Sequence, residues 1–382
     1  MYGHMDKQPF GEGWDTDPCD PVIKDGIMYG RGSNDDGYSL FCAILSIKAC
    51  QTLGRGHPRI VITIEGSEEG EIHDLIFYMQ KHKEELGNPD LVVCLDSIAN
   101  NTETLFVTST LRGCINFDVK VQTGKNNMHS GHSGAFPQPF YVINQLLGRV
   151  IDLNTQELLP DFQPKIPDYC IEQTHQVSRI WPDCKSPNIL DEVTGLTNQH
   201  AGKDDAKEKL EQNLNMWWRP TLTVIGIEGL PSDLNSAGNV VYKEITYRLS
   251  MRTAPNQDCD ELIEKLRKAF TEAPASISYN AKVDFNVVDS GPGFCAPDLP
   301  ENVKKVVTQT SRDVFEGKDP IFLGCGGSIP FMEIFGKEFP NANYLLTGCA
   351  TLTGNAHCPN ENLDLEYCRK FITAVSLVIS RI

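Results

Sequence analysis

Acidic side chains are concentrated at the end of one β-forming run. The stretch RIVITIEGSEEGE, residues 59–71, carries Glu65, Glu68, Glu69 and Glu71. Carboxylates this close together repel one another unless cations share the site or solvent surrounds the loop. The run therefore points either to a cation site or to a solvated loop.

Other stretches offer further metal ligands. MYGHMDKQP places His4 and Asp6 two residues apart, so on a strand the carboxylate could orient the imidazole. GRGSNDDG contains Asp35, LVVCLD ends in Asp96, and TGNAHCPNE contains His357. Zn²⁺ favours such mixed imidazole and carboxylate sets, and Mn²⁺ or Co²⁺ also fits. The candidate ligands are His4, Asp35 or Asp36, one of Glu68 and Glu69 with the other as a spare acid, Asp96 and His357.

The stretch GRGSNDDG, residues 30–37, has three interpretations. It looks like a phosphate loop but lacks the G-K-[ST] ending of a Walker motif. Asp35 or Asp36 could instead cap the helix that follows. A carboxylate at this turn could also bridge two cations with its two oxygens.

Composition excludes several functional classes. The 382 residues carry 34 Lys and Arg against 51 Asp and Glu, a net charge of −17 that disfavours nucleic acid and anionic membranes. No apolar run is long enough to span a membrane. The 13 Cys include no C-x-x-C pair, which indicates reduced thiols and a cytoplasmic protein. Asn100-Asn101-Thr102 fits a glycosylation acceptor only in a secretory context.

The first part of the chain alternates helices and buried strands. Helices are expected at 36–53, with Leu40, Phe41, Ile44 and Leu45 as its apolar residues, and at 74–86; strands are expected at 59–64 and 91–96. This order predicts a mostly parallel sheet covered by helices on both faces. Ligand sites in such sheets lie beyond the carboxyl ends of the strands.

A second pattern begins at CINFDVKVQ, where apolar and polar residues alternate. The order βαββαβ predicts an α+β ferredoxin-like domain at 113–289, with an aperiodic insertion at about 154–219. An α/β pattern then returns. The predicted fold class is α/β, with a discontinuous metal-binding catalytic domain, 1–112 and 290–382, interrupted by a dimerisation or lid domain.

Several motifs together resemble a known family. They are YGHMD, GRGSNDDG, EGSEEGE, CLDS, LRG…MHSG, GNVV…LSMR, GGSIPF and GNAHCPNE, in order from residue 2 to about 365. The sequence is similar to the aminoacylase, carnosinase and glutamate-carboxypeptidase family of di-zinc metallopeptidases. The resemblance implies that two Zn²⁺ make the acid cluster tolerable. One ion would be held by His4, Asp35 and Asp96 and the other by Asp35, Glu69 and His357.

The resemblance also implies roles for other residues. Glu68 would be the general base, and Asp6 the carboxylate beside His4. His129 would reach the site of a partner subunit, with His132 as an alternative donor. Asn239 and the stretch Gly326, Gly327 and Ser328 would line the substrate pocket, and the peptide after Asp35 would be cis. The histidines outside these motifs are expected at the surface: His57, His73, His82, His175 and His200.

Three departures from the family pattern stand out. An Arg that grips the substrate carboxylate is replaced by Gly324, so Arg252 or Arg112 is expected to take its place. In the family pattern a Lys follows the Asp pair, whereas in this chain Gly37 and Tyr38 follow it. Family members carry several tens of residues before the H-x-D strand, so the chain is expected to lack an N-terminal segment, and a signal peptide could be lost with it.

The expected function is hydrolysis of small peptides by a homodimeric di-zinc dipeptidase or exopeptidase. A deacylase of N-acyl amino acids with the same chemistry is the alternative. An inactive, truncated homologue that only dimerises or binds small ligands is the alternative from another class.

Overall fold

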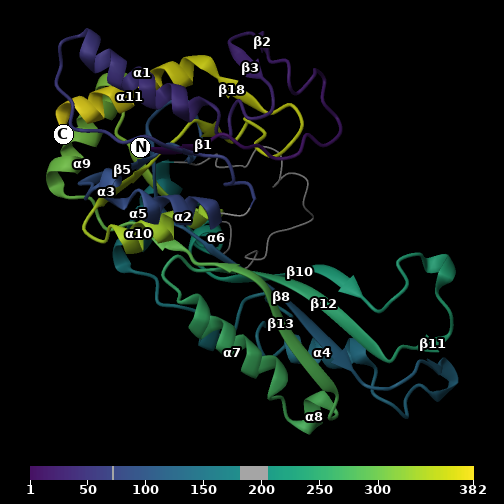
Figure 1. Cartoon of the computed structure of the whole chain (residues 1–382). Coiled ribbons are helices and arrows are strands. Elements are labelled where there is room, and N and C mark those ends of the chain that lie inside the picture. The colour runs from purple at the N-terminus through teal and green to yellow at the C-terminus, as the bar shows by residue number, and fades with distance from the viewer. Residues whose placement is uncertain (71–72, 181–204) are drawn as a thin grey trace.

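Two lobes, each built around its own sheet, make up the chain (Figure 1). The computed structural model describes residues 1–70, 73–180 and 205–382. The larger lobe has a seven-stranded sheet in the order β14-β7-β16-β5-β1-β4, with β15 also paired to β7. Its strands are β1 Tyr2–His4, β4 Thr63–Glu65, β5 Leu91–Cys94, β7 Phe106–Leu111, β14 Phe294–Cys295, β15 Ile321–Cys325 and β16 Asn343–Leu346.

The centre of this sheet is parallel, which confirms the α/β prediction. β1 runs parallel to β4 and β5, β5 runs parallel to β16, and β7 runs parallel to β15. β14 and β16 pair antiparallel with β7. Because β1, β4 and β5 end at the same edge, the residues that follow these strands gather there.

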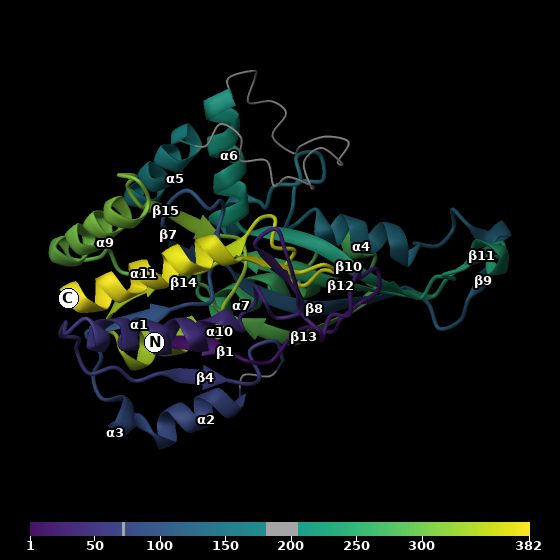
Figure 2. The same cartoon turned by 90° about the horizontal axis from the view of Figure 1, so that it is seen from above.

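Helices cover both faces of the large sheet (Figure 2). One face packs on α1 Tyr38–Thr52, α5 Asp168–Ile180, α6 Asp205–Trp217, α9 Glu301–Val314 and α11 Leu365–Arg381. The other face packs on α2 His73–Lys81 and α10 Pro330–Glu338, and α3 Lys83–Leu86 follows α2.

The smaller lobe has the ferredoxin-like strand order β10-β12-β8-β13, antiparallel throughout. Every second residue of β8 is buried, as the alternation predicts, and these residues form a core separate from that of the large sheet. The elements of this lobe are β8 Gly113–Gln122, α4 Pro139–Leu147, β10 Thr221–Glu228, β12 Glu244–Thr253, α7 Cys259–Thr271, α8 Ala275–Ser278 and β13 Lys282–Gly291.

One small three-stranded sheet and two strand pairs complete the part of the chain that the structure describes. Their members are β2 Val22–Lys24, β3 Ile27–Tyr29 and β18 Asn362–Asp364; β6 Ile98–Ala99 and β17 Ala350–Thr351; and β9 Met128–His129 and β11 Val240–Val241. The cysteines in the described part of the chain form no disulfide. Among the described residues, no helix has the length and apolar character needed to span a membrane.

Several local expectations were wrong. The strand expected at 59–64 forms only from Thr63 to Glu65, and the helix expected at 74–86 is interrupted at His82. In α1, Phe41, Ile44 and Leu45 are exposed, whereas the small residues on its other face pack closely against the sheet and α11. Within the expected insertion, 154–219, α5 and α6 share the core of the large sheet. Glu71, His200 and the rest of 181–204 lie outside the described residues.

Candidate metal centre and active site

His4 is the last residue of β1 and is completely buried at the carboxyl edge of the large sheet. Its Nδ1 lies 3.1 Å from the main-chain oxygen of Asp6 and 3.3 Å from Asp6 Oδ1. Its Nε2 lies 3.0 Å from Asp35 Oδ1 and 3.9 Å from Asp96 Oδ1. The ring is therefore fixed on one side by Asp6 and directed toward two carboxylates on the other.

Asp35 lies between the two candidate histidine ligands. Its Oδ1 faces His4, and its Oδ2 lies 2.8 Å from Nε2 of His357, in the loop between β17 and β18. The same His357 nitrogen lies 3.2 Å from Glu69 Oε1. The Asp35–Asp36 peptide is cis, as the resemblance implied. One carboxylate thus contacts imidazoles from opposite ends of the chain.

Asp36 points the other way, into the protein. It is buried, and its Oδ2 accepts a hydrogen bond from the main-chain N–H of His4 at 3.2 Å. It is not the side-chain cap of α1, because Gly37 is the N-cap residue and makes no side-chain cap hydrogen bond. The capping interpretation of GRGSNDDG was therefore wrong.

Asp6 also holds the loop that follows β4. Its Oδ1 accepts the main-chain N–H of Glu68 at 3.2 Å, and its Oδ2 accepts that of Glu69 at 2.8 Å. Gln8 donates from Nε2 to Glu69 Oε2 at 2.6 Å. The segment after β1 consequently positions both glutamates relative to His4.

The donor atoms suit divalent cations. His4, Asp35 and Glu69 form one group whose ligand atoms lie within 4.8 Å of one another, and His4, Asp36 and Asp96 form another. Within the described part of the chain, Asp36 Oδ1 is buried without a hydrogen-bond partner, and the buried Glu69 Oε1 lies 3.2 Å from His357 Nε2. Buried carboxylate oxygens are normally paired, so a cation at this place would satisfy them. Imidazole and carboxylate ligands match Zn²⁺, Mn²⁺ or Co²⁺.

Burial and mutual charge shift the pKa values of the acids. Burial and the charge of Asp96 raise the pKa of Glu68 to about 8. Burial and the charge of Asp35 raise the pKa of Asp96 to about 7. Burial would also raise the pKa of Asp35, but hydrogen bonds with His357 and His4 lower it below its usual range.

The pKa values of both candidate histidine ligands are raised as well. Burial lowers the pKa of His4, but the hydrogen bond with Asp35 and the nearby carboxylate charges outweigh it and raise the pKa to about 10. Hydrogen bonds to Asp35 and Glu69 raise the pKa of His357 to about 10. Two imidazolium groups thus neutralise carboxylates where cations could do so.

Glu361 is a site residue that sequence reasoning missed. It is completely buried, and its Oε1 accepts the main-chain N–H groups of Asn34 and Asp35, each at 3.0 Å. Its Oε2 pairs with Arg31 Nη1 at 2.7 Å, and Arg31 Nη2 donates to the oxygens of Pro9 and Phe10. Glu361 is the last residue of the GNAHCPNE motif, and this position was the only feature of the sequence that could have indicated its role. It ties the loop of His357 to the loop of Asp35.

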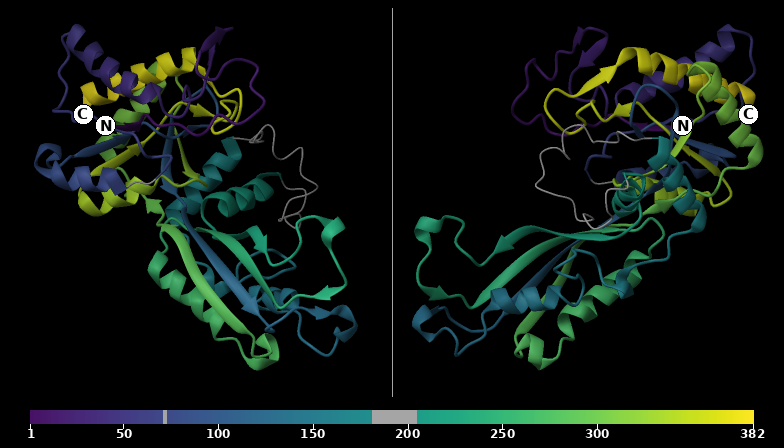
Figure 3. Two further views of the ribbon diagram at one scale, coloured as in Figure 1. Left: turned by 45° about the vertical axis from the view of Figure 1, so that its right-hand side comes forward. Right: turned by 180° about the vertical axis from the view of Figure 1, so that it is seen from behind.

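His129 and Asn239 lie together, but not at the metal centre. His129 ends β9, is exposed, and accepts the N–H of Gly131 on Nδ1 at 3.0 Å. The main-chain oxygen of Asn239 accepts the N–H of Ser130 at 2.9 Å. The strand β9, and β11 directly after Asn239, lie at the far tip of the smaller lobe, remote from β1 (Figures 2 and 3). His132 lies in the short 3-10 helix beside them.

The two arginines near the GGS stretch differ in what they contact. Arg112 donates from Nε to the oxygen of Gly326 at 3.2 Å and from Nη1 to Thr221 and the oxygens of Asn215 and Arg219. Arg252 donates from Nη1 to Ser328 Oγ at 3.4 Å. Arg112 therefore joins the main chain at Gly326 to that at Asn215 and Arg219. Of the two arginines, Arg252 is better placed to contact a ligand bound at Ser328.

Packing explains the absence of a side chain at Gly324. A Cβ there would lie 2.6 Å from Trp217 Cβ and 2.9 Å from Thr110 Oγ1. Trp217 belongs to α6, within the stretch expected to be an insertion, and is itself buried in the large core. The tryptophan thus occupies the space into which a residue at position 324 would project.

The remaining histidines follow the surface expectation only in part. His82 is exposed, but His57 and His175 are half-buried. The His73 side chain lies outside the described part.

Comparison with known proteins settles the family. The model of peptidase family M20/M25/M40 matches residues 1–381. The chain belongs to this family. It is thus a peptidase, and the resemblance to carnosinases is confirmed.

Members of family M20 with assigned activities match along most of the chain. The Cys-Gly metallodipeptidase dug1 of Schizosaccharomyces pombe is 27% identical over 377 residues, covering 96% of this chain and 76% of the relative. The human Beta-Ala-His dipeptidase is 24% identical over 369 residues, covering 95% of this chain and 70% of the relative. The solved structure of the dipeptidase Dug1p from Saccharomyces cerevisiae has a TM-score of 0.72 at 24% identity, covering 100% of this chain and 78% of that chain. This last likeness confirms the fold.

Proposed function

We propose that this M20 peptidase hydrolyses dipeptides with two divalent ions, Zn²⁺ foremost. The observation that carries the proposal is the Asp35 carboxylate, which faces His4 with one oxygen and His357 with the other. Relatives named for the cleavage of Cys-Gly and Beta-Ala-His support the substrate class.

The proposed ligand sets are those that the family resemblance implies, and the contacts around Asp35 support them. His4, Asp35 and Asp96 would hold one ion, and Asp35, Glu69 and His357 the other, with Asp35 shared. When bound, the ions supply an acidified water and polarise the scissile carbonyl. Asp6 would keep His4 oriented, because an imidazole ligand is commonly fixed through its second nitrogen.

Glu68 is the proposed general base. Its raised pKa suits an acid–base group that works near neutral pH, and Asp6 fixes its main-chain position. Glu68 would take a proton from the attacking water and then pass that proton to the leaving amine. Glu69, the next residue, would remain a ligand.

We also propose that the active form is a homodimer. His129 and Asn239 lie at the exposed tip of the smaller lobe, where they cannot act on the metal centre of their own chain in this arrangement. A second copy would bring them to the substrate, where His129 could stabilise the developing oxyanion. The segment 113–289 would form the dimer contact.

The test is hydrolysis by chain that has been stripped with a chelator and then reloaded with Zn²⁺ or Mn²⁺. The panel contains Cys-Gly, β-Ala-His, other unblocked dipeptides and N-acetyl amino acids. Metal-dependent release of amino acids from dipeptides is the expected result. Cleavage of acetylated amino acids alone would replace the proposal with the deacylase alternative, and a folded chain that binds no metal would identify an inactive homologue.

A further inference from the structure

Two cysteines that belong to none of the proposed ligand sets lie side by side in the larger lobe. Cys295 is the last residue of β14, and Cys170 lies in the first turn of α5. The two side chains interact through a hydrogen bond, and both are free thiols. The pair is therefore a nucleophilic cluster separate from the site described above.

The pattern of each element explains why the two thiols meet. In β14, Phe294 packs into the core shared with α2 and α10, whereas Cys295 packs against the core on the opposite face of the sheet. In α5, Cys170, Thr174 and Val177 recur at helical spacing and are all buried. Cys170 thus lies on the stripe of α5 that packs on the face to which Cys295 points.

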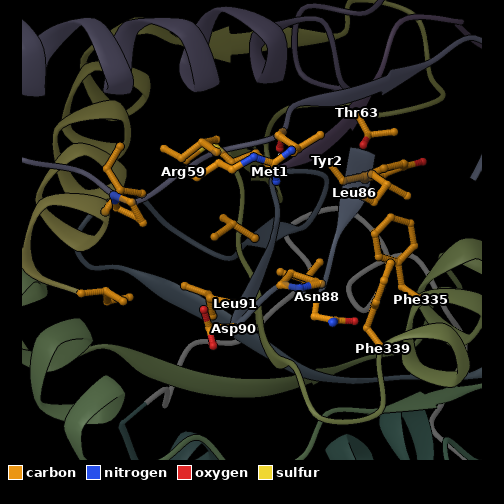
Figure 4. Close-up of a pocket in the computed structure, with 18 residues that line it drawn as sticks. Met1, Tyr2, Arg59, Thr63, Leu86, Asn88, Asp90, Leu91, Phe335 and Phe339 are labelled. Atoms are coloured by element: carbon orange, nitrogen blue, oxygen red, sulfur yellow. The ribbon is translucent and has the colours of Figure 1, made fainter. Parts of the chain in front are cut away.

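The two thiols differ in their access to solvent. Cys170 is only 1% exposed, whereas Cys295 is partly buried. A cavity of about 20 Å³, enough for a molecule of the size of water, is lined by Tyr169, Gln173 and Ala296, the residue after Cys295. It is distinct from the apolar cavity of about 300 Å³ beside Met1, which no cysteine of the described chain lines (Figure 4). A small molecule from solvent therefore reaches Cys295 first.

Tyr169 supplies a hydrogen bond to the more accessible thiol. Its hydroxyl oxygen lies 3.2 Å from Cys295 Sγ. Burial and the hydrogen bond with Cys295 raise the pKa of Tyr169 above its usual range, so the hydroxyl keeps its proton. A hydrogen bond donated to sulfur stabilises the thiolate relative to the thiol.

These contacts make the two sulfurs chemically different. Hydrogen bonds from Cys170 and Tyr169 lower the pKa of Cys295 to about 7, although burial acts in the opposite direction. The hydrogen bond with Cys295 and burial raise the pKa of Cys170 above its usual range. Near neutral pH, Cys295 is thus partly thiolate, which is the nucleophilic form, while Cys170 remains a neutral thiol.

We propose that Cys295 and Cys170 are a peroxide-reactive pair that closes to a reversible disulfide. The Cys295 thiolate attacks one oxygen of a hydroperoxide and the O–O bond breaks. Cys295 becomes a sulfenic acid, and the other oxygen leaves as water or an alcohol after it takes up a proton. The Cys170 sulfur then attacks the Cys295 sulfur, the S–O bond breaks, and the hydroxyl leaves as water with the proton of Cys170. Two thiols are oxidised and one hydroperoxide is reduced.

The disulfide would join two segments that lie on either side of most of the smaller lobe in the sequence. Cys170 precedes β10, and Cys295 belongs to the strand that directly follows β13. The bond would thus fasten α5 to β14 within the larger lobe. A dithiol reductant would reopen it by exchange, which returns both thiols.

A second pair of thiols provides an internal control. Cys349 and Cys368 also interact through a hydrogen bond, within the core that α1 and α11 share. Both are buried, Cys349 completely. Because an oxidant cannot reach buried thiols readily, this pair is expected to stay reduced under conditions that oxidise Cys295 and Cys170.

The experiment treats the reduced 382-residue chain with equimolar hydrogen peroxide at pH 7 until the peroxide is consumed, and then alkylates the remaining thiols. Peptide mass mapping without reductant is expected to find Cys170 joined to Cys295, with Cys349 and Cys368 alkylated. Subsequent dithiothreitol should return both thiols of the oxidised pair. No peptidase activity is measured, so the result is independent of the proposed function.

Variants separate the roles within the pair. Cys170→Ser removes the second thiol, so oxidation is expected to stop at a Cys295 sulfenic acid that dimedone traps. Tyr169→Phe is expected to slow disulfide formation about fivefold to tenfold, because the thiolate loses a hydrogen bond. Tyr279→Phe, at an exposed tyrosine that follows α8, is the matched control and should leave the rate unchanged.

Three results would overturn the proposal. The first is recovery of Cys170 and Cys295 in alkylated form after the peroxide treatment. The second is a sulfenic acid in the Cys170→Ser chain at cysteines other than Cys295. The third is oxidation of Cys349 and Cys368 as fast as that of Cys295 and Cys170, because access would then not select the reactive pair.

Discussion

The Glu361 carboxylate accepts a hydrogen bond of 3.0 Å from the main-chain N–H of Asp35, although the two residues lie 326 positions apart in the sequence. The Glu361 carboxylate also accepts the N–H of Asn34 and pairs with Arg31. Glu361 touches neither candidate histidine. The hydrogen bonds that Glu361 accepts nevertheless fix the peptide that carries Asp35. Glu361 itself lies four residues after His357 in the sequence.

Glu361→Gln is expected to lower Zn²⁺ affinity by about 10- to 100-fold, the usual effect of losing a group that orients a ligand. The amide oxygen could still accept the N–H groups of Asn34 and Asp35, but the amide NH2 would then face Arg31 and the charge pair would be lost, so the anchor of the Asp35 loop would be weakened. Chelator competition measures the affinity. Glu366→Gln, an exposed change on α11, is the control. Unchanged affinity in a folded Glu361→Gln chain would show that Asp35 is held by other contacts.

Glu68→Gln is expected to reduce kcat by about 10²- to 10⁴-fold while metal content stays the same, because only the proton acceptor is lost. Glu69→Gln is the matched variant, and it should lose metal. Kinetics with a dipeptide and elemental analysis of the same samples separate the two effects. Near-normal turnover in Glu68→Gln would remove this residue from the mechanism, and Glu84→Gln controls for a surface change.

Zn²⁺ binding is expected to release protons. In the metal-free chain the pKa values of His4 and His357 are raised to about 10, so both imidazoles are protonated at pH 8 and must lose a proton to coordinate. About two protons per chain should be released at pH 8, and affinity should rise with pH toward 10. Below pH 7, Asp96 adds a further proton, because its pKa is about 7. Calorimetry in two buffers of different ionisation enthalpy counts the protons; identical heats in both would contradict the prediction.

Arg252→Met is expected to lower kcat/KM for dipeptides by about 10- to 100-fold, the effect of losing a hydrogen bond to a charged group. The loss should disappear with dipeptide amides, which lack the carboxylate. Arg112→Met should instead lower Tm, because Arg112 contacts main-chain oxygens. An equal loss of kcat/KM with dipeptides and with dipeptide amides would show that Arg252 has a structural role.

Much of the site could be predicted because its ligands follow apolar strands. Runs such as LVVCLD identify a buried strand, and in a parallel sheet the next polar residue lies at the ligand-binding edge. The positions of His4, Glu68, Glu69 and Asp96 at this edge were predicted in this way, whereas the choice of Glu69 as a ligand came from the resemblance. The pairing of His357 with Asp35 needed the resemblance, since no periodicity connects those loops.

Other features depend on contacts that side-chain patterns do not report. Glu361 was missed because its partners are main-chain N–H groups. The large apolar residue Phe41 of α1 is exposed, although apolar residues are usually buried. Close packing of this helix on the sheet and α11 instead places small residues such as Ala43 on its buried face. The strand expected at 59–64 begins only at Thr63 in the structure. Its partner strand β1 begins at Tyr2, and Tyr2 pairs with Thr63.

The contact of Asp35 with both His4 and His357 also determines when the centre can form. A ribosome makes His4 before the smaller lobe and His357 after it. The candidate ligands that precede this lobe, His4, Asp35, Glu69 and Asp96, would therefore lack His357 until the chain has passed through the whole lobe. Loading of the proposed centre with metal would consequently be a late event of biosynthesis, after that lobe has had time to fold as a separate unit.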